Sequence, residues 1–393
     1  MSLVRQVYDG EKLTAELSGH ITANNAQDVE EGLLAAHRTY PAAPMELDCS
    51  DLEYISSSGL RVVLRVLKEV KRLSITNVLP AVYEVFDMTG FTMMVDVRKA
   101  YRRVSVDGCP VIGRGAKGTL YRLDDETVCK VYNDPDALDD IERERELART
   151  AFVAGIPTAI SYDVVRVGNG YGSVFELLKA DTMGDLLAKG EWDVDRVAAA
   201  SAGLLVQMSQ TKMNTSALPS ARKDALGWID LLRDVLKSPV YERVRVLVEA
   251  IPDEPHMVHG DYHMGNVMVQ DGEPLLVDMD TLSYGNGIFD LTTAYSAYDG
   301  RGLLDRQNVE QYLGISYELS CRLWDLILRK RFPNATDAQL KEAENKVRLL
   351  SAVRLMGRPL RHANIGGEMA KRTFELYGSI IDELLHSVST LAL

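Results

Sequence analysis

The sequence is poor in cysteine, the residue that marks disulfide-rich secreted proteins and many zinc sites. It has four cysteines in 393 residues, and none of them forms a Cys-x-x-Cys pair. Cysteines this far apart are typical of reduced thiols rather than of a disulfide framework. We therefore expect a cytoplasmic protein. The four are Cys49, Cys109, Cys129 and Cys321.

Long apolar runs and an excess of positive charge are also missing. No segment approaches the roughly 18 apolar residues of a spanning helix, and "MSLVRQVYDGEKL" lacks the apolar core of a signal peptide. The net charge of −13 disfavours general binding to nucleic acid or to anionic membranes. Hydrophobic residues make up 46% of the chain, which is ordinary for a globular protein with a buried core. We expect no nucleic acid and no membrane among its partners.

Three regions are predicted from the hydrophobic patterning. Residues 1–106 alternate strand-like and helix-like segments and end near the turn residues of "SVDGCP". Residues 107–180 are mostly strands around one charged helix, "DALDDIERERELARTAFVAG", and residues 181–393 are mostly helices. This order predicts a mixed α/β domain followed by an α+β domain with a β-rich and a helical lobe.

The densest polar chemistry lies in "HGDYHMGNVMVQDGEPLLVDMD", residues 259–280. Asp271 and Gly272 suit a two-residue turn between two short apolar strands. Folding the strands about this turn places Asn266 opposite Val277, with Asp278 next along the chain. The open end of the predicted hairpin therefore carries an amide oxygen and a carboxylate.

These oxygens are the groups that phosphoryl transfer requires. Asp261 is placed to orient or deprotonate a hydroxyl, and Asn266 and Asp278 are suited to bind Mg²⁺. Two alternatives remain open. The first is a zinc site formed by His259, Asp261 and His263, and the second is a set of side chains that only satisfy turns.

The β-rich region offers two features that suit nucleotide phosphates. "IGRGAKG" places Gly113, Gly115 and Gly118 before a strand, which indicates either a flap whose backbone amides approach phosphates or a flexible surface loop. Lys130 in "TVCKVY" either binds the α- and β-phosphates or extends its ammonium into water. In the first case a glutamate of the charged helix would hold the lysine, and the candidates are Glu142, Glu144 and Glu146.

"HGDYHMGNVMV" followed by "LLVDMD" resembles the catalytic segment of the aminoglycoside phosphotransferase family, part of the protein-kinase-like superfamily. The resemblance covers about residues 109–299 and implies a two-lobed enzyme that passes the γ-phosphoryl of ATP, with Mg²⁺, to a hydroxyl acceptor. Gly260 replaces the arginine of typical protein kinases, "DMD" stands where they have DFG, and APE is missing. Control by activation-loop phosphorylation is therefore not expected.

The resemblance also implies a role for individual positions. Asp261 corresponds to the catalytic base, Lys130 to the phosphate-binding lysine and Glu144 to its partner. Asn266 and Asp278 correspond to the metal ligands. The remaining implied positions are Glu176 to Leu178 beside the adenine, and His259 and Asp290 as structural support of the catalytic loop.

In the first domain, "LDCSDLEYISSSGLR" leads a strand into the N-terminus of an amphipathic helix. Ser57 and Ser58 suit capping, and a phosphoryl group there would also be favoured electrostatically. The stretch resembles STAS domains of the anti-sigma factor antagonist family over residues 1–105. The resemblance implies phosphorylation, at Ser57 first and Ser58 second, and an anti-sigma or STAS-type protein partner. Ser56 replaces the family's aspartate.

Three functions therefore compete. The chain is a regulatory Ser/Thr-kinase-like protein with a STAS module, a small-molecule phosphotransferase, or a non-catalytic nucleotide-binding scaffold. Lys130, Asp261, Asn266 and Asp278 together favour an enzyme over the scaffold. A group of arginines in "RLLSAVRLMGRPLRHANIGG" is expected to form a solvated helix face, and the alternative is a place beside the acceptor. The group comprises Arg348, Arg354, Arg358 and Arg361.

Overall fold

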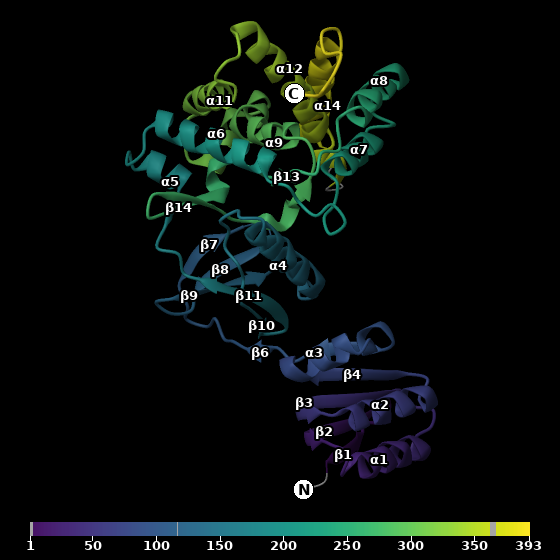
Figure 1. Ribbon diagram of the computed structural model, residues 1–393. Helices are drawn as coiled ribbons and strands as arrows, with labels where there is room; N and C mark the ends of the chain where they lie inside the picture. Colours follow the sequence, from purple (N-terminus) through teal and green to yellow (C-terminus); the bar gives the residue numbers. More distant parts are fainter. Residues whose placement is uncertain (1–2, 116, 362–366) are drawn as a thin grey trace. The chain divides into compact units, whose positions relative to one another are not determined.

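Figure 1 shows a computed structural model of the chain, which describes residues 3–115, 117–361 and 367–393. Its backbone contacts divide the chain into two compact units. The first comprises Met1–Ser105 with Val164–Asn169, and the second Val106–Asp163 with Gly170–Leu393. Within the described ranges, no helix has both the length and the apolarity to cross a membrane.

The first unit is a five-stranded sheet with helices, as the mixed α/β prediction requires. The strands run in the order β1-β2-β3-β4-β5, and only the β1–β2 pair is antiparallel. The strands are β1 (Val4–Tyr8), β2 (Leu13–Ile21), β3 (Met45–Ile55), β4 (Leu73–Val78) and β5 (Asp96–Lys99). The helices are α1 (Ala26–Thr39), α2 (Ser57–Glu69), α3 (Pro80–Met88) and the short 3₁₀ turn η1 (Phe91–Met93).

Helix α2 differs from its prediction at its start. Its cap is Ser56, whose hydroxyl accepts a hydrogen bond from the Gly59 amide at 3.3 Å, so the expected capping by Ser57 and Ser58 is wrong. Both serines lie in the first helical turn, where Ser57 is exposed. The helix is amphipathic, as predicted, and its buried face includes Val62, Val63 and Val66.

The second unit begins with a lobe of antiparallel strands and one long helix. Strands β7, β8, β9 and β11 pair along the sheet, and β8 and β9 form an antiparallel hairpin. The parallel pair of β6 (Arg102–Arg103) and β10 (Asp163–Val167) belongs to the first unit, except for Asp163. The elements of the lobe are β7 (Val111–Arg114), β8 (Gly118–Arg122), β9 (Thr127–Tyr132), α4 (Leu138–Val153) and β11 (Gly170–Glu176).

The rest of the second unit is mainly helical, with short strands near the first lobe (Figure 1). Its helices are α5 (Met183–Ala188), α6 (Val194–Gln210), α7 (Ala221–Leu231), α8 (Ser238–Glu249), α9 (Ile288–Tyr298), α10 (Arg306–Leu313), α11 (Tyr317–Arg331), α12 (Asp337–Met356), α13 (Arg358–Arg361) and α14 (Glu368–Leu384). Its strands are β12 (Asp181–Thr182), β13 (Met257–Val258), β14 (Val267–Gln270), β15 (Glu273–Leu276) and β16 (Ser283–Tyr284). The 3₁₀ turns are η2 (Met264–Asn266), η3 (Met279–Thr281) and η4 (Gly300–Leu303).

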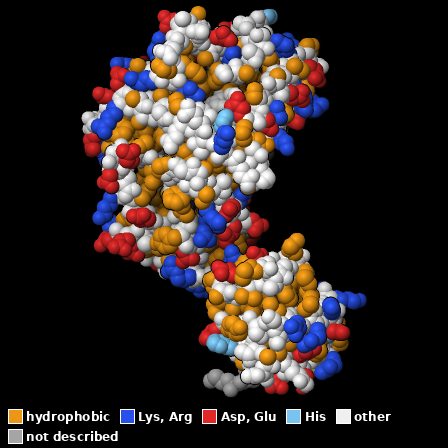
Figure 2. Space-filling view, in the orientation of Figure 1, with side chains coloured by type: hydrophobic (Ala, Val, Ile, Leu, Met, Phe, Trp, Pro, Cys, Tyr) orange, Lys and Arg blue, Asp and Glu red, His pale blue; other side chains and the backbone are white. Residues whose placement is uncertain are grey.

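The core of the helical lobe surrounds α9, in which all eleven residues are buried. Helix α12 packs against α9 and α14, and α11 packs against α6. Helix α12 begins with a capping box, in which the Thr336 hydroxyl accepts from the Gln339 amide and the Gln339 side chain accepts from the Thr336 amide. The surface is charged with both signs, and Figure 2 shows acidic and basic side chains interspersed over the visible face.

Gly118 is required by close packing within the β-rich lobe. A Cβ at this position would lie 2.4 Å from the carbonyl oxygen of Val131 in the neighbouring strand, which is a clash with backbone. At Gly115 the nearest atom would be 3.9 Å away, which is ordinary contact. Gly115 therefore has room for a side chain, whereas Gly118 does not.

We expect Gly118→Ala to destabilise the second unit by about 1–3 kcal/mol, the usual cost of forcing a group into a filled space. Gly115→Ala is the matched control and should change the free energy of unfolding by less than about 0.5 kcal/mol. Urea denaturation of the two variants and the wild type measures both values. Equal stability of the two variants would contradict the assignment.

Candidate active site

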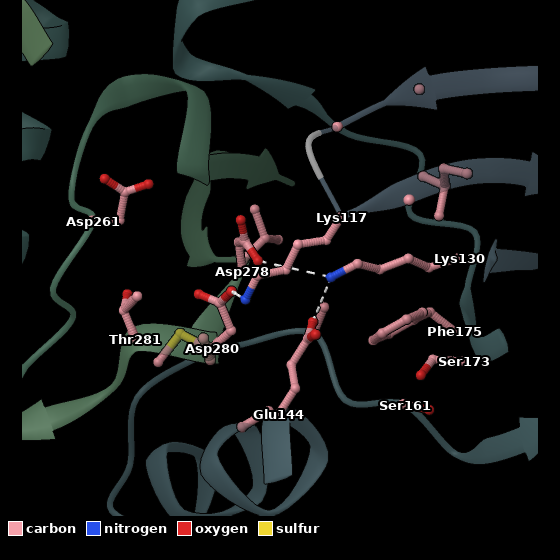
Figure 3. A pocket seen from close by; sticks show the side chains of 18 of the residues that line it. Lys117, Lys130, Glu144, Ser161, Ser173, Phe175, Asp261, Asp278, Asp280 and Thr281 are labelled. Atoms are coloured by element: carbon pink, nitrogen blue, oxygen red, sulfur yellow. Dashed lines mark hydrogen bonds and ion pairs between the residues drawn. The ribbon is translucent and has the colours of Figure 1, made fainter. Parts of the chain in front are cut away.

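A cleft of about 740 Å³ opens in the second unit, lined by both of its lobes. The β-rich lobe contributes Lys130 from β9 and Glu144 from α4, and the helical lobe contributes Asp261 and Asp278 (Figure 3). Residues separated by more than a hundred positions in the chain thus face one space. The sequence-predicted residues that line it are Gly113, Gly115, Gly118, Lys130, Glu144, Glu176, Leu178, Asp261 and Asp278.

A buried carboxylate binds the backbone of the loop that carries Asp261. Asp290 of α9 accepts hydrogen bonds from the amides of His259 and Gly260, at 3.1 and 2.9 Å. Gly260 has φ of 83°, and a Cβ on it would lie 2.6 Å from the carbonyl oxygen of Thr281. No side chain fits there, which explains why glycine stands where typical protein kinases have arginine. Asp290 therefore occupies the supporting place that its position implied.

The hairpin after this loop forms as predicted. Asp271 and Gly272 both have positive φ, 52° and 87°, as the two central residues of a tight turn require. The amide of Val277 donates to the carbonyl oxygen of Asn266 at 3.0 Å, so these two residues lie opposite each other. The Asn266 side-chain nitrogen donates to the backbone oxygen of Asp261 at 2.9 Å. Asn266 thus joins the hairpin to the loop and does not itself line the cleft within the described residues.

Asp278 has φ of 61°, in the left-handed region that non-glycine residues rarely adopt. Such a conformation costs of order 1 kcal/mol or more and persists only where the surroundings enforce it. The Asp278 side chain, held in this conformation, extends into the cleft, and its carboxylate lies 3.8 Å from the Lys130 ammonium. Burial and the neighbouring Asp280 raise the pKa of Asp278, against the opposing effect of Lys130.

The Lys130 ammonium does not extend into water. It lies 2.7 Å from a Glu144 carboxylate oxygen, and the lysine side chain is only 21% exposed. The second oxygen of Glu144 accepts from the Tyr132 hydroxyl at 2.9 Å, which fixes the carboxylate. Of the three glutamates considered, Glu144 is therefore the partner, while Glu142 and Glu146 pair with arginines of their own helix.

A second lysine enters the cleft without having been singled out in the sequence. Lys117, which lies between Gly115 and Gly118 of the flap, pairs with Asp280, the last residue of "DMD" (Figure 3). Burial lowers the pKa of Lys117, but the nearby carboxylates, Asp280 foremost, raise it above its usual value. A lysine between two glycines of such a flap is a usable signal, but Asp280 is identified as its partner only by the fold.

The two histidines of the segment do not form a zinc site. His259 uses both ring nitrogens on backbone groups, Nδ1 with the Asp261 amide and Nε2 with the Val277 oxygen. His263 Nδ1 accepts from the Gly265 amide at 3.1 Å, and its Nε2 lies 2.5 Å from the Tyr312 hydroxyl. Throughout residues 3–115, 117–361 and 367–393, no three His, Cys, Asp or Glu side chains are grouped to hold a metal ion.

Arg354, at the end of α12, is not part of a solvated helix face, so that expectation is wrong for this residue, whereas Arg358 and Arg361 are exposed. Arg354, Arg358 and Arg361 line the cleft, together with Arg301 of η4. Arg354 lies 3.6 Å from the Asp261 carboxylate, and its side chain is 14% exposed. Burial raises the pKa of Asp261, but nearby cations, Arg354 foremost, bring it below its usual value. Arg348 is not among the lining residues in the described chain.

Apolar side chains line another part of the cleft. They are Ile112, Leu120, Val128 and Phe175 from the β-rich lobe and Met268 from β14. Glu176, Leu177 and Leu178, which follow β11, line the cleft as well. An apolar lining of this kind suits a planar heterocycle.

Comparison with known proteins gives a family for each unit. Residues 108–324 match the family model described as the phosphotransferase enzyme family, and residues 4–96 match the STAS domain model of the Mlab type. BtrV of Bordetella bronchiseptica, provisionally named an anti-sigma factor antagonist, is 38% identical over 101 residues. That match covers 25% of this chain and 85% of BtrV.

Solved structures of antibiotic kinases are similar at lower identity. A thermostable mutant of the aminoglycoside phosphotransferase APH(4)-Ia, with ADP and hygromycin B, is 13% identical with a TM-score of 0.49, covering 72% of this chain and 94% of that one. The amicoumacin kinase hAmiN, with AMP-PNP, Ca²⁺ and its antibiotic, is 15% identical with a TM-score of 0.48, covering 79% and 94%.

The burial of His263 predicts a pH dependence of stability. Burial lowers its pKa from the ordinary 6.5 to about 4. In the unfolded chain this histidine takes up a proton below about pH 6.5, whereas in the folded chain it stays neutral down to about pH 4. The free energy of unfolding therefore falls as the pH falls through this range. From these two pKa values, the loss between pH 7.5 and pH 5 is about 2 kcal/mol.

His263→Asn keeps an acceptor for the Gly265 amide and should remove most of this pH dependence. Tryptophan fluorescence during urea unfolding measures it selectively, because Trp192, Trp228 and Trp324 all lie in the second unit. The exposed His386 provides the control variant His386→Asn, which should keep the wild-type slope. Identical slopes in all three proteins would contradict the assignment.

Proposed function

Since the chain belongs to the phosphotransferase enzyme family and carries an N-terminal STAS domain, we propose that it passes the γ-phosphoryl group of MgATP to a hydroxyl acceptor. In this reaction the bond between the γ-phosphorus and the ADP oxygen breaks, and a bond to the acceptor oxygen forms. The acceptor proton leaves to the Asp261 carboxylate. The observation that carries the proposal is the Lys130 ammonium, located between Glu144 at 2.7 Å and Asp278 at 3.8 Å.

On the nucleotide side, Lys130 would bind the phosphates while Glu144 holds it in place. A lysine acts there as a point charge, and a fixed carboxylate partner keeps that charge aimed at the cleft. Lys117 would add a second cation from the flap. The adenine would lie in the apolar slot near Glu176 to Leu178, and the backbone of Gly113 and Gly115 would cover the phosphates.

Asn266 and Asp278 would hold Mg²⁺, although within the described residues only Asp278 lines the cleft. Both offer hard oxygen donors, which Mg²⁺ prefers. The Asn266 nitrogen is already committed to the Asp261 carbonyl oxygen, which leaves the side-chain oxygen as the free end of the amide. When bound, the cation would neutralise charge that develops on the phosphates.

Asp261 would orient the acceptor hydroxyl. Its lowered pKa keeps it ionised at neutral pH, so it accepts a hydrogen bond from the hydroxyl and receives the proton late in the transfer. Catalysis would depend on positioning and on electrostatic stabilisation more than on strong basicity. His259 and Asp290 would act through the loop, by holding its backbone.

The presence of a STAS domain favours a regulatory enzyme that resembles Ser/Thr kinases. In this enzyme the STAS domain would recruit an anti-sigma or STAS-type protein. A small-molecule phosphotransferase with the same domain as a sensor is the second candidate, and the arginines of the cleft favour it. A scaffold that only binds nucleotide is disfavoured, because Lys130, Glu144, Asp261 and Asp278 all face one cleft.

Asp261→Asn should lower phosphoryl transfer at least about 100-fold, because the carboxylate that receives the proton is lost while the side-chain shape is kept. Incubation with γ-labelled ATP and a cell extract, separated into protein and metabolite fractions, measures the transfer and shows which fraction holds the acceptor. Asp271→Asn, in the exposed hairpin turn, is the matched control and should leave transfer unchanged. Wild-type turnover in Asp261→Asn would contradict the proposed role.

Ser57 is the proposed phosphorylation site of the STAS domain, with Ser58 as the second candidate. Its hydroxyl is exposed in the first turn of α2, where a phosphoryl group is favoured by the helix dipole. If the chain phosphorylates this domain, mass spectrometry after incubation with MgATP should find phosphate on Ser57. The modification should be missing in Ser57→Ala and in Asp261→Asn. Consumption of ATP without any phosphate on Ser57 would identify a different acceptor.

A further inference from the structure

Four arginines converge on the part of the cleft that adjoins Asp261. Arg301 comes from η4, Arg354 from the last turn of α12, and Arg358 and Arg361 from α13. Three elements that are separate in the chain therefore deliver positive charge to one wall. We call these four residues the arginine wall.

Little negative charge in the protein compensates the arginine wall. Within the described residues, its one ion pair is Arg354 with Asp261, at 3.6 Å. The other contacts hold the arginines without neutralising them. Arg354 donates to the backbone oxygen of Gly260 at 3.3 Å, and Arg361 donates to the backbone oxygen of Arg354 at 3.1 Å. Arg301 lies over the Tyr312 ring, 4.3 Å from its centre.

Two donors of the wall are buried and unused. The Nε atoms of Arg301 and Arg354 have no hydrogen-bond partner among the residues that the structure describes. A buried donor without a partner destabilises the free protein, more so when it is charged. Burial lowers the pKa of Arg354 to about 10, and the repulsion from Arg301 and Arg361 adds to this effect. The free protein therefore maintains an unfavourable concentration of cations at this place.

The phosphates of a nucleotide do not account for these arginines. The lysines of the cleft, Lys130 and Lys117, are each paired with a carboxylate, Glu144 or Asp280. The arginine wall instead reaches Asp261 through Arg354, and Asp261 is the group proposed to meet the acceptor hydroxyl. Its charge is thus on the acceptor side of the transferred phosphoryl group.

We propose that the acceptor is a small hydroxyl compound that carries an oxyanion, a phosphate monoester or a carboxylate, and that the arginine wall binds this anionic group. This inference rests on the proposed function. Arginine suits the task because its planar fork of donors matches the paired oxygens of both groups. A polycationic acceptor such as an aminoglycoside would meet repulsion at the same wall.

Titration of the full-length protein with simple anions tests the proposal. The protein is first saturated with AMP-PNP and Mg²⁺, so that the γ-phosphoryl position is filled, and is then titrated by calorimetry with inorganic phosphate, with malonate and with kanamycin. Phosphate or malonate should bind, and whichever binds more tightly shows which oxyanion the wall prefers. Kanamycin should not bind in competition with them.

Arg358→Glu and Arg361→Glu should each weaken anion binding by at least about tenfold, the effect of losing a charge-assisted hydrogen bond. Both residues are exposed on the cleft wall, so the substitutions should leave the fold and the AMP-PNP affinity unchanged. Arg322 is an exposed arginine of α11 that does not line the cleft, so Arg322→Glu is the matched control. This variant carries the same change of charge and should bind anions as tightly as the wild type.

Three outcomes would overturn the inference. Neither anion binds, the charge reversals have no effect on anion binding, or anions that bind to the nucleotide-free protein are displaced when AMP-PNP is added. Displacement would mean that the arginines bind the nucleotide.

The affinity for AMP-PNP is measured separately, and a protein that does not bind AMP-PNP would count against the proposed function. Anion titrations of the nucleotide-free protein would then still decide whether the arginine wall binds an oxyanion. Lys130→Met is the control variant for the nucleotide side.

Discussion

The ion pair between Lys130 and Glu144 is the interaction on which the cleft depends. It joins the middle of strand β9 to helix α4 at 2.7 Å, and the Asp278 carboxylate approaches the same ammonium from the helical lobe at 3.8 Å. Both carboxylates thus act on one ammonium, and the Lys130 side chain is bound by groups of both lobes.

The charges of the cleft are divided by function. Where a nucleotide and a cation would bind, the lysines are paired with carboxylates, so their positive charge is compensated in the free protein. Where an acceptor would bind, the arginines have one ion pair within the described residues, between Arg354 and Asp261 at 3.6 Å. This arrangement allows Asp261 to remain ionised in spite of its burial, because the arginines offset the cost of removing its charge from water.

Local patterns predicted the local elements well. The turn at Asp271 and Gly272 and the opposition of Asn266 and Val277 depend on residues close together in the chain, and both are present. The expectation that failed for Arg354 concerns what a helix faces. The surroundings of Arg354 are set by packing partners distant in sequence, which a single helical stretch cannot reveal.

The amino-acid sequence by itself determined the order of the domains, the hairpin with its two oxygen donors and the family resemblance of each domain. These follow from short-range backbone preferences and from the spacing of residues within motifs. Only the tertiary structure decided that Lys117 meets Asp280 and that Arg301, Arg354, Arg358 and Arg361 line the same cleft as Asp261. The reason is physical: the sign and strength of an electrostatic interaction depend on distance and burial, which arise when distant segments pack together.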